Sequence, residues 1–226
     1  MNPRIDKAAL SAGGEPGAKP EPGGGARLAT RALPPPRVDG GLPLMQALQR
    51  RRSQRAFASQ ALPEPVLADL LWAACGVNRP QSDGRTAPRA LALQAIDVYV
   101  ALPAGLCLYD PAGHRLHLTV PRDLRALTGN QDFPAVAALD LVFVADHRAV
   151  PWVQAEQCQA YAWVAAGAMA QNVYLYCASM GLASVLRAWV DREALSAAMA
   201  LRPGQQVLLA QSVGYPEPGI CGDDRP

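Results

Sequence analysis

The segment from Val153 to Met180 constrains the fold most, because it predicts one long helix that ends at Gly181. Its weakly polar part runs from Ala160 to Leu182, consists largely of alanine and is interrupted by Gln171 and Asn172. This composition is typical of a helix buried in a protein core and not of one that spans a membrane. We therefore expect no association with a membrane.

Strands are predicted on both sides of this helix. Alternating, β-branched residues predict strands over 96–102, 106–110, 115–119, 139–146, 182–190 and 205–215. Shorter helices are expected over 44–53, 66–76 and 121–129, and after Asp191, which is a helix-capping residue. The pattern predicts an α+β (mixed α/β) fold, with a central mixed sheet flanked by helices and one long central helix.

Residues 1–43 differ in composition from the remainder, since they contain eight Pro, eight Gly and no aromatic residue. Such a segment cannot bury enough apolar surface to offset its ordering entropy, so we expect a disordered tail. Half of the 226 residues are hydrophobic, which is enough for one core. We place the ordered domain at 44–218 and a short C-terminal tail at 219–226.

Charge and cysteine usage exclude several functional classes. The net charge is +2, and residues 44–226 are neutral, with 15 basic and 15 acidic residues, which argues against a nucleic-acid binder. The five cysteines are widely spaced and form no C-x-x-C, as expected for reduced thiols in a cytoplasmic protein. The N-terminus has no apolar stretch, so we expect no signal peptide.

The familiar nucleotide and metal motifs are absent from the sequence. It contains no Walker loop, no Rossmann glycine fingerprint and no G-x-S-x-G. His114 and His117 lie three residues apart on a predicted strand and therefore point to opposite faces. We expect no metal site.

One short motif is a candidate for phosphate binding. Arg51, Arg52, Ser53 and Arg55 gather at the junction between a predicted helix and the loop after it. Arginine presents forked donors that match phosphate oxygens. The alternative is a solvated basic helix end, where arginine favours the negative end of the helix dipole. Both interpretations stay open from these residues alone.

Further segments follow this motif in a characteristic order: RTAPRALALQAIDVYV, a helix ending in CASMGL, SVLRAWVDREAL and QSVGYP. The ordered set resembles the nitroreductase family of FMN-dependent oxidoreductases, over about Leu44 to Pro216. RTAPRALALQAIDVYV, LYD and LWAACGVNRP are most similar to its azoline-dehydrogenase-like branch. The resemblance implies a nitroreductase-like fold and a homodimer with FMN in the dimer interface.

The resemblance also implies which residues bind FMN. The basic motif would contact the phosphate and ribityl chain. The loop against the isoalloxazine ring corresponds to Pro88, Arg89, Ala90, Ala92 and Gln94, where Arg89 and Ala92 replace a small polar residue and an Asn of the family. Backbone N–H groups near flavin N5 correspond to Leu186, Arg187 and Ala188, beside an unusually bulky Trp189.

Two further expectations concern charge and helix packing. Arg89 or Arg187 would supply a positive charge to the N1–C2 edge of the flavin. Ala166, Gly167 and Ala170 would let the long helix approach a partner chain closely, although ordinary internal packing explains them equally well.

The resemblance implies an enzyme without catalytic side chains, because the flavin carries the redox chemistry. NAD(P)H would be the electron donor, and a nitroaromatic, a quinone or a similar small molecule the acceptor. One alternative is an FMN-dependent azoline dehydrogenase that acts in the maturation of a modified peptide. The other is a degenerate nitroreductase-like binding protein without catalysis, an interpretation that the departures at Arg89 and Ala92 motivate.

Overall fold

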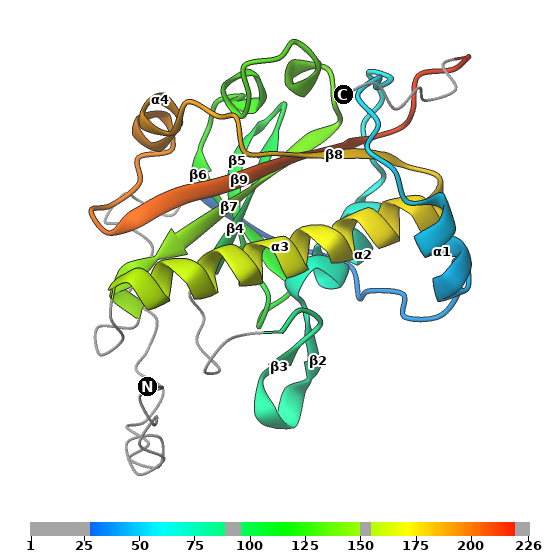
Figure 1. The fold of residues 1–226 in the computed structure, drawn as a ribbon, viewed down its shortest axis with the longest axis horizontal. Helices are drawn as coiled ribbons and strands as arrows, with labels where there is room; N and C mark the ends of the chain where they lie inside the picture. The colour runs from blue at the N-terminus through cyan, green and yellow to red at the C-terminus, as the bar shows by residue number, and fades with distance from the viewer. Residues whose placement is uncertain (1–27, 89–95, 150–154, 220–226) are drawn as a thin grey trace, which may run out of the picture.

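A seven-stranded sheet organises the chain, with strand order β1-β6-β5-β4-β7-β9-β8 (Figure 1). The computed structural model describes residues 28–88, 96–149 and 155–219. The strands of this sheet are β1 (Ala29–Ala32), β4 (Ile96–Leu102), β5 (Gly105–Asp110), β6 (Arg115–Val120), β7 (Leu139–Asp146), β8 (Ala183–Arg187) and β9 (Gln205–Gly214). A separate hairpin comprises β2 (Val77–Arg79) and β3 (Gly84–Arg85). The helices are α1 (Leu44–Arg50), α2 (Glu64–Cys75), α3 (Ala155–Met180) and α4 (Arg192–Ala198).

The predicted α+β class and the long central helix are confirmed. Every pairing between the described strands is antiparallel, so the sheet differs from the mixed one that we expected. The long helix is described from Ala155, and its predicted first residues, 153 and 154, lie outside the described residues. It ends as predicted, before Gly181 with φ 69°. Among the described residues, no helix has both the length and the hydropathy that crossing a bilayer requires.

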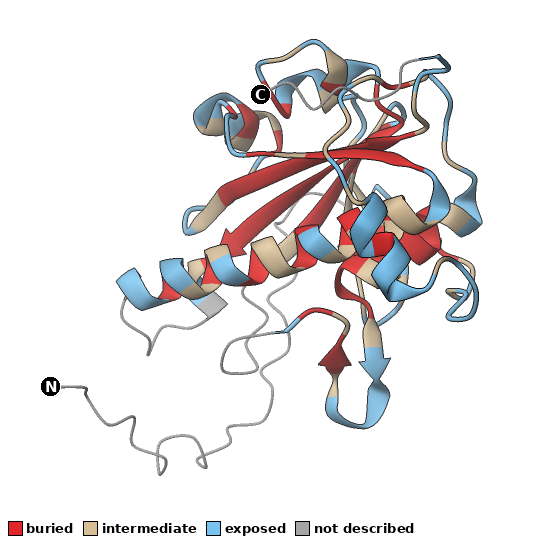
Figure 2. Cartoon of the chain, turned by 45° about the vertical axis from the view of Figure 1, so that its right-hand side comes forward, coloured by how far each residue is buried: buried red, intermediate tan, exposed pale blue. Residues whose placement is uncertain are grey.

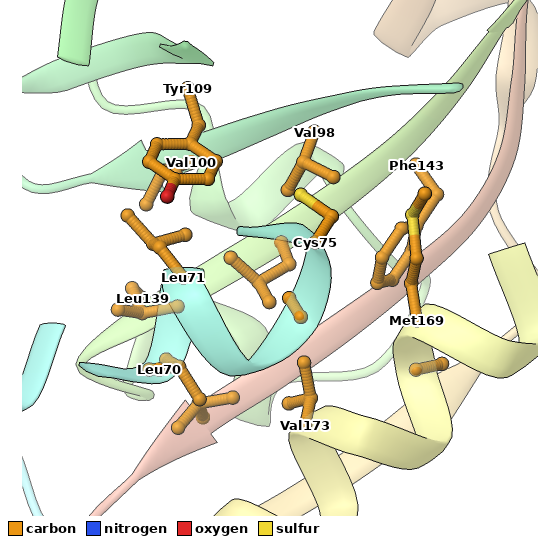
Figure 3. Packing of buried hydrophobic residues seen from close by; sticks show 14 of the residues in the cluster. Leu70, Leu71, Cys75, Val98, Val100, Tyr109, Leu139, Phe143, Met169 and Val173 are labelled. Carbon is orange, nitrogen blue, oxygen red and sulfur yellow. The ribbon is translucent and has the colours of Figure 1, made fainter. Parts of the chain in front are cut away.

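The main core lies between one face of the sheet and the helices α2 and α3 (Figure 3). Leu71 of α2 and Met169 of α3 point toward side chains of β4 and β7, including Phe143. The opposite face carries a second cluster under α4, centred on Leu195. β7 is buried along its whole length, as a strand covered on both faces must be (Figure 2).

Residues 28–43 are ordered, contrary to the boundary predicted at residue 43. β1 pairs with β6, and the chain then crosses α2, where the backbone and guanidinium of Arg37 donate to the buried carboxylate of Asp69 at 2.6–2.8 Å. Further on, the backbone N–H of Leu42 donates to the hydroxyl of Ser179 at 2.7 Å. Polar contacts to distant residues and the burial of Leu33 in the main core therefore order this segment.

The helix predicted over 121–129 is wrong, since only a single 3₁₀ turn forms at Arg125–Leu127. The side chain of Asp123 accepts the backbone N–H of Arg125 at 3.0 Å and also its guanidinium. That guanidinium donates to the carbonyl of Ala137 at 2.6 Å as well. Such local side-chain bonds compete with helical hydrogen bonds and explain the irregular course of the chain.

A buried ion pair links three strands on the side of the sheet away from α3. Arg187 of β8 donates to Asp140 of β7 at 2.9 Å and to the hydroxyl of Ser212 of β9 at 2.5 Å. It also donates to the hydroxyl of Thr128 at 3.0 Å, and its guanidinium lies 5.2 Å from the Phe133 ring centroid. Burial raises the pKa of Asp140 to about 6, against the opposing effects of the Arg187 charge and the Ser212 hydrogen bond.

We expect Asp140→Ala to destabilise the fold strongly, because Arg187 would remain buried without its counterion. The free energy of unfolding should fall by about 3–5 kcal/mol in urea denaturation at pH 7. The double variant Asp140→Leu/Arg187→Met removes both charges and should recover most of the loss. A double variant no more stable than the single one would contradict this interpretation.

Candidate functional site

The basic motif at residues 51–55 lies beside β8, the strand that follows the long helix α3. The two segments are far apart in the sequence. α1 ends at Arg50, and the chain then runs extended beside β8, where the backbone N–H of Gln54 donates to the Ser184 carbonyl at 2.9 Å. Phe57 forms a β-bridge with Pro216, just beyond β9. The motif therefore lies along the outer edge of β8, which has only one neighbour among the described strands.

Tyr174 of α3 joins these two segments. Its hydroxyl accepts the backbone N–H of Leu186 at 2.7 Å and shares a hydrogen bond with the Ser53 hydroxyl at 2.9 Å. The guanidinium of Arg51 lies 5.4 Å from its ring centroid, within the range of a cation–π contact. Tyr174 was not predicted, because its only signal in the sequence is a polar aromatic residue in an alanine-rich helix.

A concave pocket of about 440 Å³ opens beside this junction. Arg50, Arg51 and Arg52 line it on one side, and the end of α3 with Leu182 lines it on the other. None of the described residues that line it is acidic, so it is strongly cationic. A pocket of this kind favours an anionic group such as a phosphate, to which guanidinium groups donate in pairs.

The pocket includes only part of the predicted phosphate motif. Arg51 and Arg52 line it, whereas Ser53 and Arg55 do not. Ser53 lies behind the pocket against Tyr174, and the Arg55 side chain is exposed. Arg50 was not predicted, because its place on the predicted helix gave no indication that it would face the same pocket.

The outer edge of β8 continues away from this pocket. Its first outward-facing groups are used within the chain, since Ser184 accepts from Gln54 and Leu186 donates to Tyr174. Ala188 follows Arg187, the last residue of β8, and its carbonyl accepts the guanidinium of Arg192 at 2.9 Å. Of the three predicted backbone donors, Leu186 is used by Tyr174, and the roles of the Arg187 and Ala188 N–H groups stay predictions.

The side chain of Arg187 takes no part in this edge. It points to the other side of the sheet, is only 6% exposed and binds Asp140, Ser212 and Thr128. The expectation that Arg187 supplies a positive charge to a flavin is therefore wrong.

The predicted ring-binding loop is described only at its start. Pro88 is exposed and follows Ala87, which is buried, and Thr86, whose hydroxyl donates to the carbonyl of Trp72 at 3.0 Å. Arg89, Ala90, Ala92 and Gln94 lie outside the described residues. Their roles stay predictions.

We expect Tyr174→Phe to weaken the junction without unfolding the chain. The variant leaves the Leu186 N–H and the Ser53 hydroxyl without their partner, and the free energy of unfolding should fall by about 1–3 kcal/mol. Urea denaturation measures this loss. Tyr161→Phe on the same helix is the matched control and should change stability by less than about 0.5 kcal/mol. Equal losses in both variants would contradict the role assigned to Tyr174.

Both the sequence and the fold of this chain are similar to those of known proteins. A Methanocaldococcus jannaschii protein that is named as an inferred nitroreductase is 30% identical to this chain over 161 residues. The matched residues make up 66% of this chain and 81% of that protein. The crystal structure of a similarly described nitroreductase from Ralstonia eutropha has a TM-score of 0.81 and 46% identity, over 89% of this chain and 96% of that chain.

Two more distant structures share the fold. The microcin synthetase McbBCD complex of E. coli, with a truncated pro-peptide bound, has a TM-score of 0.67 at 20% identity, over 74% of this chain and 70% of that chain. The NADPH:FMN oxidoreductase of Vibrio harveyi has a TM-score of 0.60 at 21% identity, over 80% of this chain and 72% of that chain.

The match to the family itself covers most of the chain and includes both parts of the candidate site. The sequence pattern of the nitroreductase family matches residues 48–215, which extend from α1 to just beyond β9. This chain belongs to the nitroreductase family.

Proposed function

We propose that the chain is an FMN-dependent oxidoreductase of the nitroreductase type. It would take electrons from NAD(P)H and pass them to a nitroaromatic, a quinone or a similar small acceptor. The observation that carries the proposal is the cationic pocket at Arg50–Arg52, at one end of the outer edge of β8. Family membership and the fold shared with an NADPH:FMN oxidoreductase support it.

The described residues fit the chemical groups of FMN. The phosphate suits the three guanidinium groups of the pocket, which no acidic lining residue neutralises. At the other end of β8, the N–H of Ala188 suits an acceptor atom of the ring. The five residues of β8 span roughly 16 Å at about 3.3 Å per residue, the scale of an extended mononucleotide.

In this proposal the protein binds and orients, while the cofactor reacts. Bound FMN would supply the redox chemistry, accepting a hydride equivalent from the nicotinamide and giving two electrons to the acceptor. Arg51 and Arg52 would bind the phosphate, and Tyr174 would keep β8 in place through the Leu186 N–H. The edge of β8 would then present the Ala188 N–H in a fixed direction, without reorganisation during turnover.

The proposal includes a homodimer. Leu44 and Met45 on α1 are 62% and 75% exposed, and Val164 on α3 is 69% exposed. These exposed apolar side chains on α1 and α3 support a surface that another chain covers. A second copy of this chain is the partner that we propose, as in the resemblance to the family. We also propose a cytoplasmic location, for which the wide spacing of the five cysteines and the lack of a C-x-x-C in the sequence are the support.

Azoline dehydrogenation is the second candidate. The fold shared with the McbBCD complex, a microcin synthetase, is the observation that favours it. Such an enzyme would remove two electrons and two protons from an azoline ring of a peptide, with no need for a nicotinamide. Bleaching of the flavin absorbance by an azoline-containing peptide, but not by NAD(P)H, would favour this candidate over the first.

We expect the purified protein to bind FMN. Its visible absorption spectrum, with added FMN and after removal of the excess, should show a flavin band shifted from that of free FMN. Anaerobic addition of NADH or NADPH should bleach this band. A protein that retains no flavin would contradict the proposal and favour the non-catalytic alternative.

Arg51→Ala and Arg52→Ala should each weaken FMN binding about tenfold or more, because each removes a charged donor to the phosphate. Affinity for riboflavin, which has no phosphate, should change little. The measurement is a fluorescence titration with both flavins.

Arg55→Ala is the matched control, because it removes the same charge three or four residues away, outside the pocket lining. It should leave both affinities near those of the parent. An equal loss of riboflavin affinity in the Arg51 and Arg52 variants would show that these residues do not contact the phosphate.

A further inference from the structure

Trp189 is a large aromatic side chain that the fold leaves exposed. It is 70% exposed, whereas its neighbours Arg187 and Val190 are each only 6% exposed. Tryptophan residues usually bury most of their surface, and exposed ones occur often where a ligand or partner binds. The exposed indole therefore needs an explanation that lies outside the core.

The turn that carries Trp189 is held rigidly. The carbonyl of Ala188 accepts the backbone N–H of Val190 at 3.1 Å and the guanidinium of Arg192 at 2.9 Å. Arg192 also donates to the carbonyls of Val207 and Leu208 of β9, each at 3.1 Å. The Arg192 guanidinium thus links the Ala188 carbonyl to β9, while the indole ring itself stays uncovered.

Two more contacts stabilise the turn that carries Trp189. The guanidinium of Arg192 lies 5.9 Å from the ring centroid of Trp163 on α3, which adds a cation–π contact. Asp191 caps α4 by accepting the backbone N–H of Ala194 at 3.0 Å. A rigid support lets an aromatic ring bind a ligand without an added ordering cost for the loop.

The turn has a defined place relative to the candidate site. It connects the end of β8 to α4 (Figure 1). Trp189 directly follows Ala188, the residue whose N–H the proposed function assigns to the flavin ring. The indole therefore borders the end of the site where the flavin ring, and not its phosphate, would lie.

We infer that Trp189 is a specificity-determining residue, against which planar aromatic acceptors stack when they bind beside the flavin. This inference rests on the proposed function and names the substrate class that the site favours. Stacking is tolerant of substituents because every aromatic ring has a π-face, so the indole selects for planarity and not for one compound. Arg192 is the positioning residue that keeps the indole in place.

The test measures binding of 1,4-naphthoquinone to the oxidised, FMN-loaded protein without any reductant, so that no turnover occurs. Trp189→Ala should raise the dissociation constant about tenfold, the size typical of losing one aromatic stacking partner. Trp189→Phe keeps a ring and should raise it only about twofold to threefold. The Phe variant also serves if the Ala variant folds poorly.

Val38→Ala is the matched control, since Val38 is 72% exposed and lies on the segment that crosses α2. It should leave the dissociation constant unchanged. A second measurement uses ferricyanide, a non-planar acceptor, with NADH as donor. Trp189→Ala should lower kcat/KM for naphthoquinone about tenfold and leave kcat/KM for ferricyanide unchanged.

The outcomes separate the two proposals. Normal FMN binding with unchanged naphthoquinone affinity in both Trp189 variants overturns this inference and leaves the proposed function intact. A change in molecular mass in solution for Trp189→Ala also overturns it, because the indole would then lie in an interface between copies. A protein that binds no FMN overturns the proposed function and this inference together.

Discussion

The buried contact between Arg187 and Asp140 determines where the edge of the sheet lies, and the candidate site depends on that edge. β8 is the last strand in the described part of the sheet, where β9 is its one neighbour. Arg187 ties it to β7 and β9 from the inside, and Tyr174 and Gln54 bond to it from the outside. Because an edge strand is otherwise free to shift, these opposed contacts define the direction of its outward-facing groups.

Local sequence patterns were sufficient for most of the elements. The strands β4, β7 and β9 lie within about two residues of their predicted bounds, and the helix α3 ends where it was predicted to end, because each buries a continuous or periodic set of apolar side chains. Residues 28–43 could not be predicted in this way, since their order comes from hydrogen bonds to partners as distant as Ser179. The irregular segment near Arg125 escaped prediction because side-chain bonds there compete with the backbone.

The site was predictable in outline but not in its individual contacts. The resemblance named both Arg51 and the segment at Leu186, and the structure brings them together through Tyr174, which no local pattern identified. The side-chain direction of Arg187 depends on which face of β8 each residue takes, and one position along a strand reverses it. Arg89 and its neighbours lie outside the described residues, so the ring-binding loop stays a prediction.

The long sequence separation of these contacts has a consequence for the order of folding. β1 pairs with β6, Leu42 bonds to Ser179, and Gln54 bonds to Ser184. Each of these early segments therefore forms its contacts only when a much later segment is present. During synthesis on a ribosome, the N-terminal arginines would emerge long before the strand that completes their pocket. The chain must therefore fold largely after most of it has been made, and its high share of non-local pairings predicts slow folding.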